Sequence, residues 1–318
     1  MKQVLVKNYG DFWVNVQEAS EQLQLLAPDE PIEFVIQEGI SLEASGLADY
    51  IKRWQNSTGR TSDQIQISCV NHQDQLPWKN VHPEQSACWA MSRGYWTDNV
   101  KFVSDPAMIG LFVSRRTVAR NVIMYDCADL WPNNVLLSRT RHHTPEPWQD
   151  ARENFDLWGD TARQNQIMSW YQNCPVTSID NIMHRDQFDP AKNTNASLLE
   201  HYHKFFVELC LETMTLGGSF FPTEKIARPI VGLKPFMVYA ARNYLANLRR
   251  LGFETFGDIW DESYDQFEGP ERWSRMREAI DHVLSDPNLI THCADIVDHN
   301  RRALKRLVPT SFLNSIVL

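Results

Sequence analysis

The sequence predicts an α/β fold in which parallel strands alternate with helices. Two observations carry this prediction. Two separate stretches of the chain follow the order strand, helix, strand with short connections, and such βαβ units place their strands in parallel. The chain also has 318 residues, enough for two domains of roughly 150 residues each.

The first alternating stretch lies in the N-terminal third. Residues 32–36 (IEFVI) form a short block of β-branched and aromatic residues that Gly39 ends, which is typical of a strand. A helix is expected next, with apolar residues at helical spacing from Leu47 onward and Ser41 as its cap. Residues 65–70 (IQISCV) predict the second strand.

The second stretch starts with a strand at 109–113 (IGLFV), continues with a helix from about 118 to 125, and reaches another strand at 135–137. Residues 71–103 and 139–200 lack clear periodicity. We expect loops and short helices in the first of these segments and an excursion at a cleft in the second. The later chain predicts strands at 205–211 and 236–239, a helix capped by Thr223, and further helices at about 241–251, 270–284 and 288–307.

These elements suggest a division into residues 1–103, residues 104–287 and a final segment, 288–318. By analogy with other two-domain α/β proteins, we expect the final helix to pack back across the junction between the two domains.

Composition restricts the class of protein. Hydrophobic residues make up 43% and charged residues 22% of the chain, which excludes collagen-like, coiled-coil and wholly disordered proteins. No apolar run approaches the ~18 residues of a membrane span, and the N-terminus lacks the apolar stretch of a signal peptide, so we expect a cytoplasmic protein without a membrane span. The six cysteines form no CxxC pair and are expected to be reduced and mostly buried.

The charge balance is acidic. Forty acidic against 31 basic residues give a net charge of −9, which disfavours a protein coated in positive charge for nucleic acid. One basic face on an acidic body remains compatible with this balance.

Candidate site residues follow from the sheet. Open α/β sheets bind ligands at the carboxyl ends of their strands, where helix N-termini point into the crevice. A helix N-terminus with a lysine in its first turn, together with arginines from another turn, supplies the donors that a diphosphate needs. Glutamate in a first helical turn is also a common partner of the helix dipole, so a purely structural role stays open. The candidates after predicted strands are Glu38, Asn71, Arg115, Arg116 and Glu212. Arg120 comes from the same βα turn as Arg116, and Thr223, Glu224 and Lys225 form the helix start.

One segment carries a family resemblance. Residues 221–238 (FPTEKIARPIVGLKPFMV) resemble the donor-site signature of fucosyltransferase-like GT-B glycosyltransferases, in which T-E-K at a helix start precedes a small-residue turn and a P-[FV]-[IVM]-V strand. Residues 205–213 and 110–120 resemble strands of the same donor domain. Residues 248–265 are similar to a pattern in glycosyltransferase-like proteins of phages and large viruses. The resemblance covers residues 109–138 and 203–285, about half of the chain.

The resemblance implies two Rossmann-like domains facing a cleft, with the acceptor side in 1–103 and the nucleotide-sugar side in 104–287. Lys225 and an arginine of the turn that holds Arg116 and Arg120 would bind the donor diphosphate. Glu224 would bind the nucleoside ribose, and Glu212 would face the donor sugar. The aromatic residues that follow T-E-K in the family are replaced here by Ile-Ala-Arg, so the resemblance does not extend to GDP-fucose as the donor.

The expected reaction is an inverting displacement from a UDP- or GDP-linked sugar, in which Glu38 deprotonates the acceptor hydroxyl. The assignment of Glu38 rests on its place after a strand. The chain has no Asp-x-Asp pattern, so cationic side chains would neutralise the leaving group, and neither a metal ion nor a cofactor other than the nucleotide sugar is expected.

Two acceptors stay open. The phage-like pattern suggests a hydroxymethylated pyrimidine in DNA, with Asn71, Arg139 and Arg141 as acceptor contacts, the two arginines at the DNA backbone. The acidic net charge favours a glycan or a small-molecule hydroxyl. A catalytically silent relative that binds a nucleotide sugar or nucleic acid is the non-enzymatic alternative.

Overall fold

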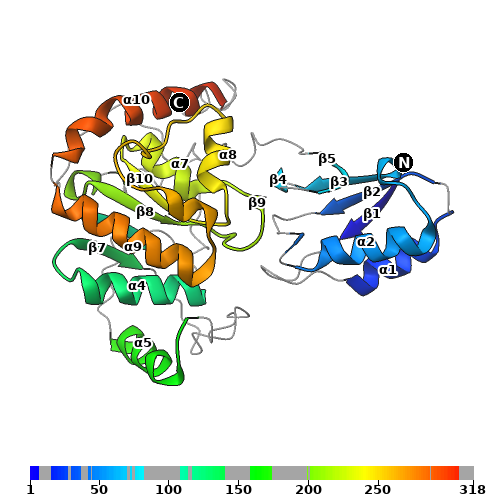
Figure 1. Ribbon diagram of the computed structural model, residues 1–318, viewed down its shortest axis with the longest axis horizontal. Helices are drawn as coiled ribbons and strands as arrows, with labels where there is room; N and C mark the ends of the chain where they lie inside the picture. Colours follow the sequence, from blue (N-terminus) through cyan, green and yellow to red (C-terminus); the bar gives the residue numbers. More distant parts are fainter. Residues whose placement is uncertain are drawn as a thin grey trace, which may run out of the picture.

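In the computed structural model, the chain forms two four-stranded parallel sheets, each with its own hydrophobic core (Figure 1). The expected α/β class with parallel strands is therefore confirmed. The structure describes residues 1–6, 16–27, 30–36, 42–43, 45–69, 72–73, 76–81, 108–113, 117–139, 158–173, 199, 201–286 and 288–307.

The N-terminal sheet has the strand order β1-β2-β3-β5. Its strands are β1 (Lys2–Val6), β2 (Ile32–Ile36), β3 (Ile65–Cys69) and β5 (Lys79–Val81). The crossover helices are α1 (Val16–Gln24) and α2 (Leu47–Thr58). Alternate residues of β2 are buried, and the sheet packs on Ala19 and Leu23 of α1 and on Leu47 and Ile51 of α2.

Three features of this half differ from the sequence expectation. Strand β5 lies within 71–103, where we expect loops and short helices. The strand β1 and the helix α1 carry polar residues at many positions, and the apolar pattern does not single them out. Helix α2 begins at Leu47 and not near Ser41, because Gly46 has a φ of 74° and turns the chain in a left-handed conformation that favours glycine.

The C-terminal sheet has the order β10-β8-β6-β7, and every residue of β6, β8 and β10 is buried. Helices α4 and α9 lie along one face and α7 and α10 along the other (Figure 1), which explains why these strands are buried and largely apolar. The strands are β6 (Ile109–Val113), β7 (Val135–Arg139), β8 (Val207–Leu211) and β10 (Phe236–Tyr239). The helices are α4 (Val118–Leu130), α5 (Thr161–Asn173), α7 (Glu224–Val231), α8 (Tyr244–Arg250), α9 (Gly269–Ser285) and α10 (Leu289–Leu307).

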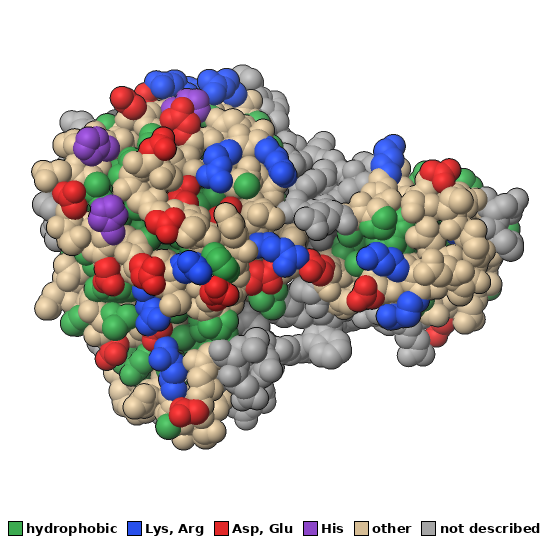
Figure 2. Space-filling view, in the orientation of Figure 1, with side chains coloured by type: hydrophobic (Ala, Val, Ile, Leu, Met, Phe, Trp, Pro, Cys, Tyr) green, Lys and Arg blue, Asp and Glu red, His purple; other side chains and the backbone are tan. Residues whose placement is uncertain are grey.

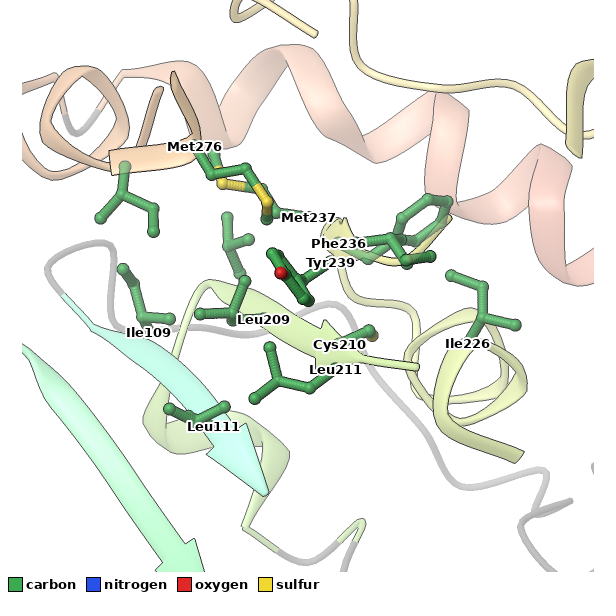
Figure 3. Packing of buried hydrophobic residues seen from close by; sticks show 14 of the residues in the cluster. Ile109, Leu111, Leu209, Cys210, Leu211, Ile226, Phe236, Met237, Tyr239 and Met276 are labelled. Carbon is green, nitrogen blue, oxygen red and sulfur yellow. The ribbon is translucent and has the colours of Figure 1, made fainter. Parts of the chain in front are cut away.

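The core of this half lies between the sheet and its helices. Figure 3 shows Leu111 of β6, Leu209 and Leu211 of β8, and Met237 of β10 within one cluster. Packing is close enough to require glycine at position 110, since a Cβ there would lie 2.8 Å from the Phe205 ring.

Helix α10 belongs to the same core. It packs against α7, and its Cys293 and Val297 join the buried cluster. Whether the final segment crosses between the two halves stays a prediction, since residues 308–318 lie outside the described residues. None of the described helices is both long and apolar enough to span a bilayer.

The cysteines that the structure describes are buried, as expected: Cys69, Cys127, Cys210 and Cys293. The expectation for Cys88 and Cys174 concerns residues outside the described ranges.

A buried lysine lies at the amino-terminal end of β8 and β10. Lys234 is 1% exposed, its Nζ donates to the carbonyl oxygen of Phe205 at 2.9 Å, and burial lowers its pKa from 10.5 to about 7 despite the attraction of Glu208. The folded state therefore binds this proton less strongly than the unfolded state does. The free energy of unfolding should rise with pH between about 7 and 10.5 because of this group.

Replacing Lys234 with methionine should remove this contribution. The difference in unfolding free energy between the wild type and Lys234→Met should shift in favour of the wild type by up to ~1.4 kcal/mol per pH unit across this window. Urea unfolding at pH 7 and pH 9.5 measures the difference, with the exposed Lys305→Met as control. A difference that does not change with pH would contradict the lowered pKa of Lys234.

Candidate functional site

The C-terminal sheet has one edge suited to ligands. Strand β7 lies on one side of β6 and β8 on the other, so the strand order reverses between β6 and β8. Open α/β sheets bind ligands at the carboxyl ends of the strands at such a point. Residues 114–116 after β6 lie outside the described residues, while Glu212 and Thr213 directly follow β8.

Glu212 joins this edge to two helices. Its side chain is fully buried and accepts hydrogen bonds from the Thr223 backbone N–H at 3.1 Å, the Thr223 hydroxyl at 2.5 Å and the Tyr244 hydroxyl at 2.8 Å. A buried carboxylate is tolerated only when donors surround it. Glu212 therefore fixes the start of α7, and the first residue of α8, at the end of β8.

Arg120 is expected to contact a diphosphate, but in the structure its side chain is buried and binds the backbone. Its side chain projects from α4, is 2% exposed, and donates from Nη2 to the carbonyl oxygens of Leu211 and Glu212 at 2.9 Å each. The guanidinium therefore stabilises the backbone at the carboxyl end of β8 and does not face solvent in this structure.

Thr223 is the N-cap residue of α7, as the sequence predicts. Its side-chain oxygen accepts from the Lys225 backbone N–H at 3.3 Å while its hydroxyl proton goes to Glu212. The residue is 3% exposed, so its role is to hold the first turn of the helix in place.

Lys225 is the cationic group of this edge. Its Nζ lies 2.7 Å from Glu224 Oε1, 3.2 Å from Thr223 Oγ1 and 3.4 Å from Thr213 Oγ1. The Lys225 side chain is 15% exposed and that of Glu224 is 36% exposed. Burial raises the pKa of the Glu224 carboxyl, but the adjacent Lys225 ammonium outweighs burial and holds this pKa below its usual value.

Helix α8 starts at the same edge, but a carboxylate of the protein already caps it. Asp265 accepts from the N–H groups of Leu245 at 3.0 Å and Ala246 at 3.1 Å. Of these two helix starts, α7 is the one that carries a lysine in its first turn, and the Lys225 backbone N–H donates to the Thr223 side chain.

A second charged group lies beyond the end of β10. Arg242 pairs with Glu43 of the N-terminal half at 2.6 Å and with Glu268 at 3.2 Å. The same Glu43 accepts the backbone N–H of Gly218 at 3.1 Å. Arg242 lies three residues after the predicted strand at 236–239, as Arg116 does after the strand at 109–113, so the rule that selected the other candidates would have found it.

The structure therefore brings together Glu212, Thr223, Glu224 and Lys225, with Arg120 beneath them, and adds Thr213, which sequence reasoning did not select. Arg139 ends β7, and its acceptor role stays a prediction. The remaining candidates lie outside the described residues: Glu38, Asn71, Arg115, Arg116 and Arg141.

Within the described ranges, no group of three or more His, Cys, Asp or Glu side chains is arranged to hold a metal ion. Comparison with protein-family models and with curated proteins gives no match to this chain. The evidence for the candidate site is therefore its geometry.

Replacing Thr223 with valine should destabilise the fold. The change removes the α7 cap and one donor to the buried Glu212 carboxylate, which together should cost about 2–3 kcal/mol. Thr223→Ser retains the hydroxyl and should lose much less. Urea unfolding compares the two variants, and equal stability would refute the structural role of this hydroxyl.

Proposed function

We propose that the protein is a glycosyltransferase that moves a sugar from a nucleotide diphosphate donor to a hydroxyl group. The observation that carries this proposal is the position of Lys225, whose ammonium group lies between two threonine hydroxyls at the reversal of strand order. The donor diphosphate would bind at this edge of the C-terminal sheet.

The chemistry of the edge suits a departing diphosphate. Negative charge develops on the leaving group as the sugar is transferred, and a fixed cation with hydrogen-bond donors stabilises it. Lys225 supplies the charge, and the first turn of α7 contributes the positive end of the helix dipole. An arginine of the preceding βα turn, Arg115 or Arg116, would add a second cation.

The two glutamates have different roles in this proposal. Glu224 is partly exposed, so its carboxylate can turn away from Lys225 when a phosphate group binds Lys225 instead. The carboxylate can then accept hydrogen bonds from ribose hydroxyls. Glu212 is fully buried with three donors around its carboxylate. We therefore assign Glu212 and Arg120 to positioning the site, in place of the expected contacts with sugar and phosphate.

The acceptor side would come from the N-terminal sheet, as in a GT-B arrangement. This is supported by the segment between β2 and α2, which reaches the C-terminal half through Glu43. Glu38 belongs to the same segment and is proposed as the base that takes the acceptor proton.

Exposed basic side chains on two helices support a DNA acceptor. Figure 2 shows them over the C-terminal end of α10 and over α8, with acidic side chains among them, on a chain whose net charge is −9. Arg249 is paired with Glu262 and Arg302 with Asp298. The exposed cations of these two helices are Arg249, Arg250, Arg302, Lys305 and Arg306. Such a surface would contact phosphates of a polymeric acceptor, and binding to hydroxymethylated DNA should then weaken steeply with salt.

The test of the proposed function uses Lys225→Ala and a panel of UDP- and GDP-sugars. Transfer from the accepted donor should fall by about 10²-fold, because a group that stabilises the leaving group is lost. The exposed Lys204→Ala is the matched control and should transfer at the wild-type rate.

Wild-type transfer by Lys225→Ala would overturn the site assignment. Binding of a nucleotide sugar by the wild type, without transfer or hydrolysis for any donor, would instead support the catalytically silent alternative.

A further inference from the structure

One carboxylate connects the N-terminal half to two separate parts of the C-terminal half. The Glu43 carboxylate accepts from Arg242 Nη2 at 2.8 Å through Oε1 and 2.6 Å through Oε2. Its Oε2 also accepts the backbone N–H of Gly218 at 3.1 Å. These partners lie 199 and 175 residues away along the chain, so the contacts depend on how the two halves meet.

The Gly218 contact is on the segment that frames Lys225. This segment runs from the end of β8 to the start of α7 and is called the 212–223 loop here. Thr213 and Thr223, whose hydroxyls lie beside Lys225 Nζ, are near its two ends. Gly218 is near its middle.

The same loop is held a second time by the N-terminal half. It contains β9 (Ser219–Phe220), which pairs in antiparallel fashion with β4 (His72–Gln73) of that half. In Figure 1, the β9 loop reaches from the C-terminal sheet toward β4. The loop that frames the candidate diphosphate site therefore contacts the N-terminal half through Gly218 and through the neighbouring strand β9.

The strength of the Glu43 contacts suits a reversible connection. The Glu43 side chain is 58% exposed and that of Arg242 is 37% exposed, and exposed ion pairs add little to folding stability. Arg242 also has Glu268, a partner within its own half, so its charge stays paired if Glu43 moves away.

We propose that Glu43 is a positioning residue for the diphosphate site. It anchors the 212–223 loop through the Gly218 N–H and thereby keeps Thr213 and Thr223 in place around Lys225, with Arg242 orienting the carboxylate. This inference rests on the proposed function. It makes donor affinity depend on contact between the two halves.

Four variants separate the parts of this arrangement. Glu43→Ala removes both contacts, whereas Glu43→Gln retains an oxygen for the Gly218 N–H and loses the charge. Arg242→Gln removes the ion pair and leaves the Gly218 contact. Glu268→Gln is the matched control, since it removes the partner of Arg242 that lies within the C-terminal half.

We expect Glu43→Ala to weaken the binding of UDP or GDP, whichever the wild type binds, by about tenfold in Kd. Glu43→Gln and Arg242→Gln should weaken it by only about threefold, and Glu268→Gln should leave it unchanged. In a transfer assay, the donor KM should rise in Glu43→Ala while kcat stays the same. Urea unfolding should show little change, which distinguishes positioning from general destabilisation.

Amide hydrogen exchange provides a readout that needs no nucleotide. Exchange of the 212–223 loop should be faster in Glu43→Ala than in Glu43→Gln, and unchanged in Glu268→Gln. If the wild type binds neither nucleotide, the proposed function fails, but the exchange comparison still decides whether Glu43 holds the loop. Wild-type exchange of this loop in Glu43→Ala would overturn the proposal, and so would a wild-type Kd of Glu43→Ala when the wild type binds nucleotide.

Discussion

The buried carboxylate of Glu212 is the constraint on which the candidate site depends. It lies at the end of β8, where the chain leaves the sheet, and satisfies its oxygens with Thr223 and Tyr244. A buried carboxylate without hydrogen-bond donors would destabilise the fold. The start of α7 therefore cannot move away from β8 without removing donors from Glu212. The hydrogen bonds between Glu212 and Thr223 therefore hold Lys225 at the sheet edge.

The same principle recurs along the edge. Arg272 is fully buried and donates to the carbonyl oxygens of Val238 and Ala241 as well as to Asp265, which in turn caps α8. Arg120 does the equivalent for β8 from helix α4 in the same layer. Buried charges therefore fix the chain where it leaves β8 and β10, and rigid support of this kind is what a precise binding site requires.

Contact between the two halves has a different character. Among the described residues it includes a two-residue ladder between β4 and β9, the ion pair of Glu43 with Arg242, whose side chains are partly exposed, and the hydrogen bond from Gly218 to Glu43. Such contacts form and break at small energetic cost. The C-terminal edge is thus fixed by buried charges, whereas its described contacts with the N-terminal half include partly exposed groups.

Local sequence patterns predicted the strands whose residues are all buried, β6, β8 and β10, and the cap at Thr223. They missed β1, in which the exposed Lys2 and Gln3 interrupt the pattern. They could not tell a buried arginine from a ligand-binding one at position 120, because burial depends on how α4 packs over the end of β8. For the same reason, the contact of Glu43 with Gly218 and Arg242 required the tertiary structure.

A crystal structure of the protein with UDP or GDP bound tests the central claim most directly. We predict that the diphosphate lies at the carboxyl ends of β6 and β8, with a phosphate oxygen within hydrogen-bonding distance of Lys225 Nζ. A nucleotide bound at another place, with Lys225 still paired to Glu224 and Thr213, would contradict the proposed site.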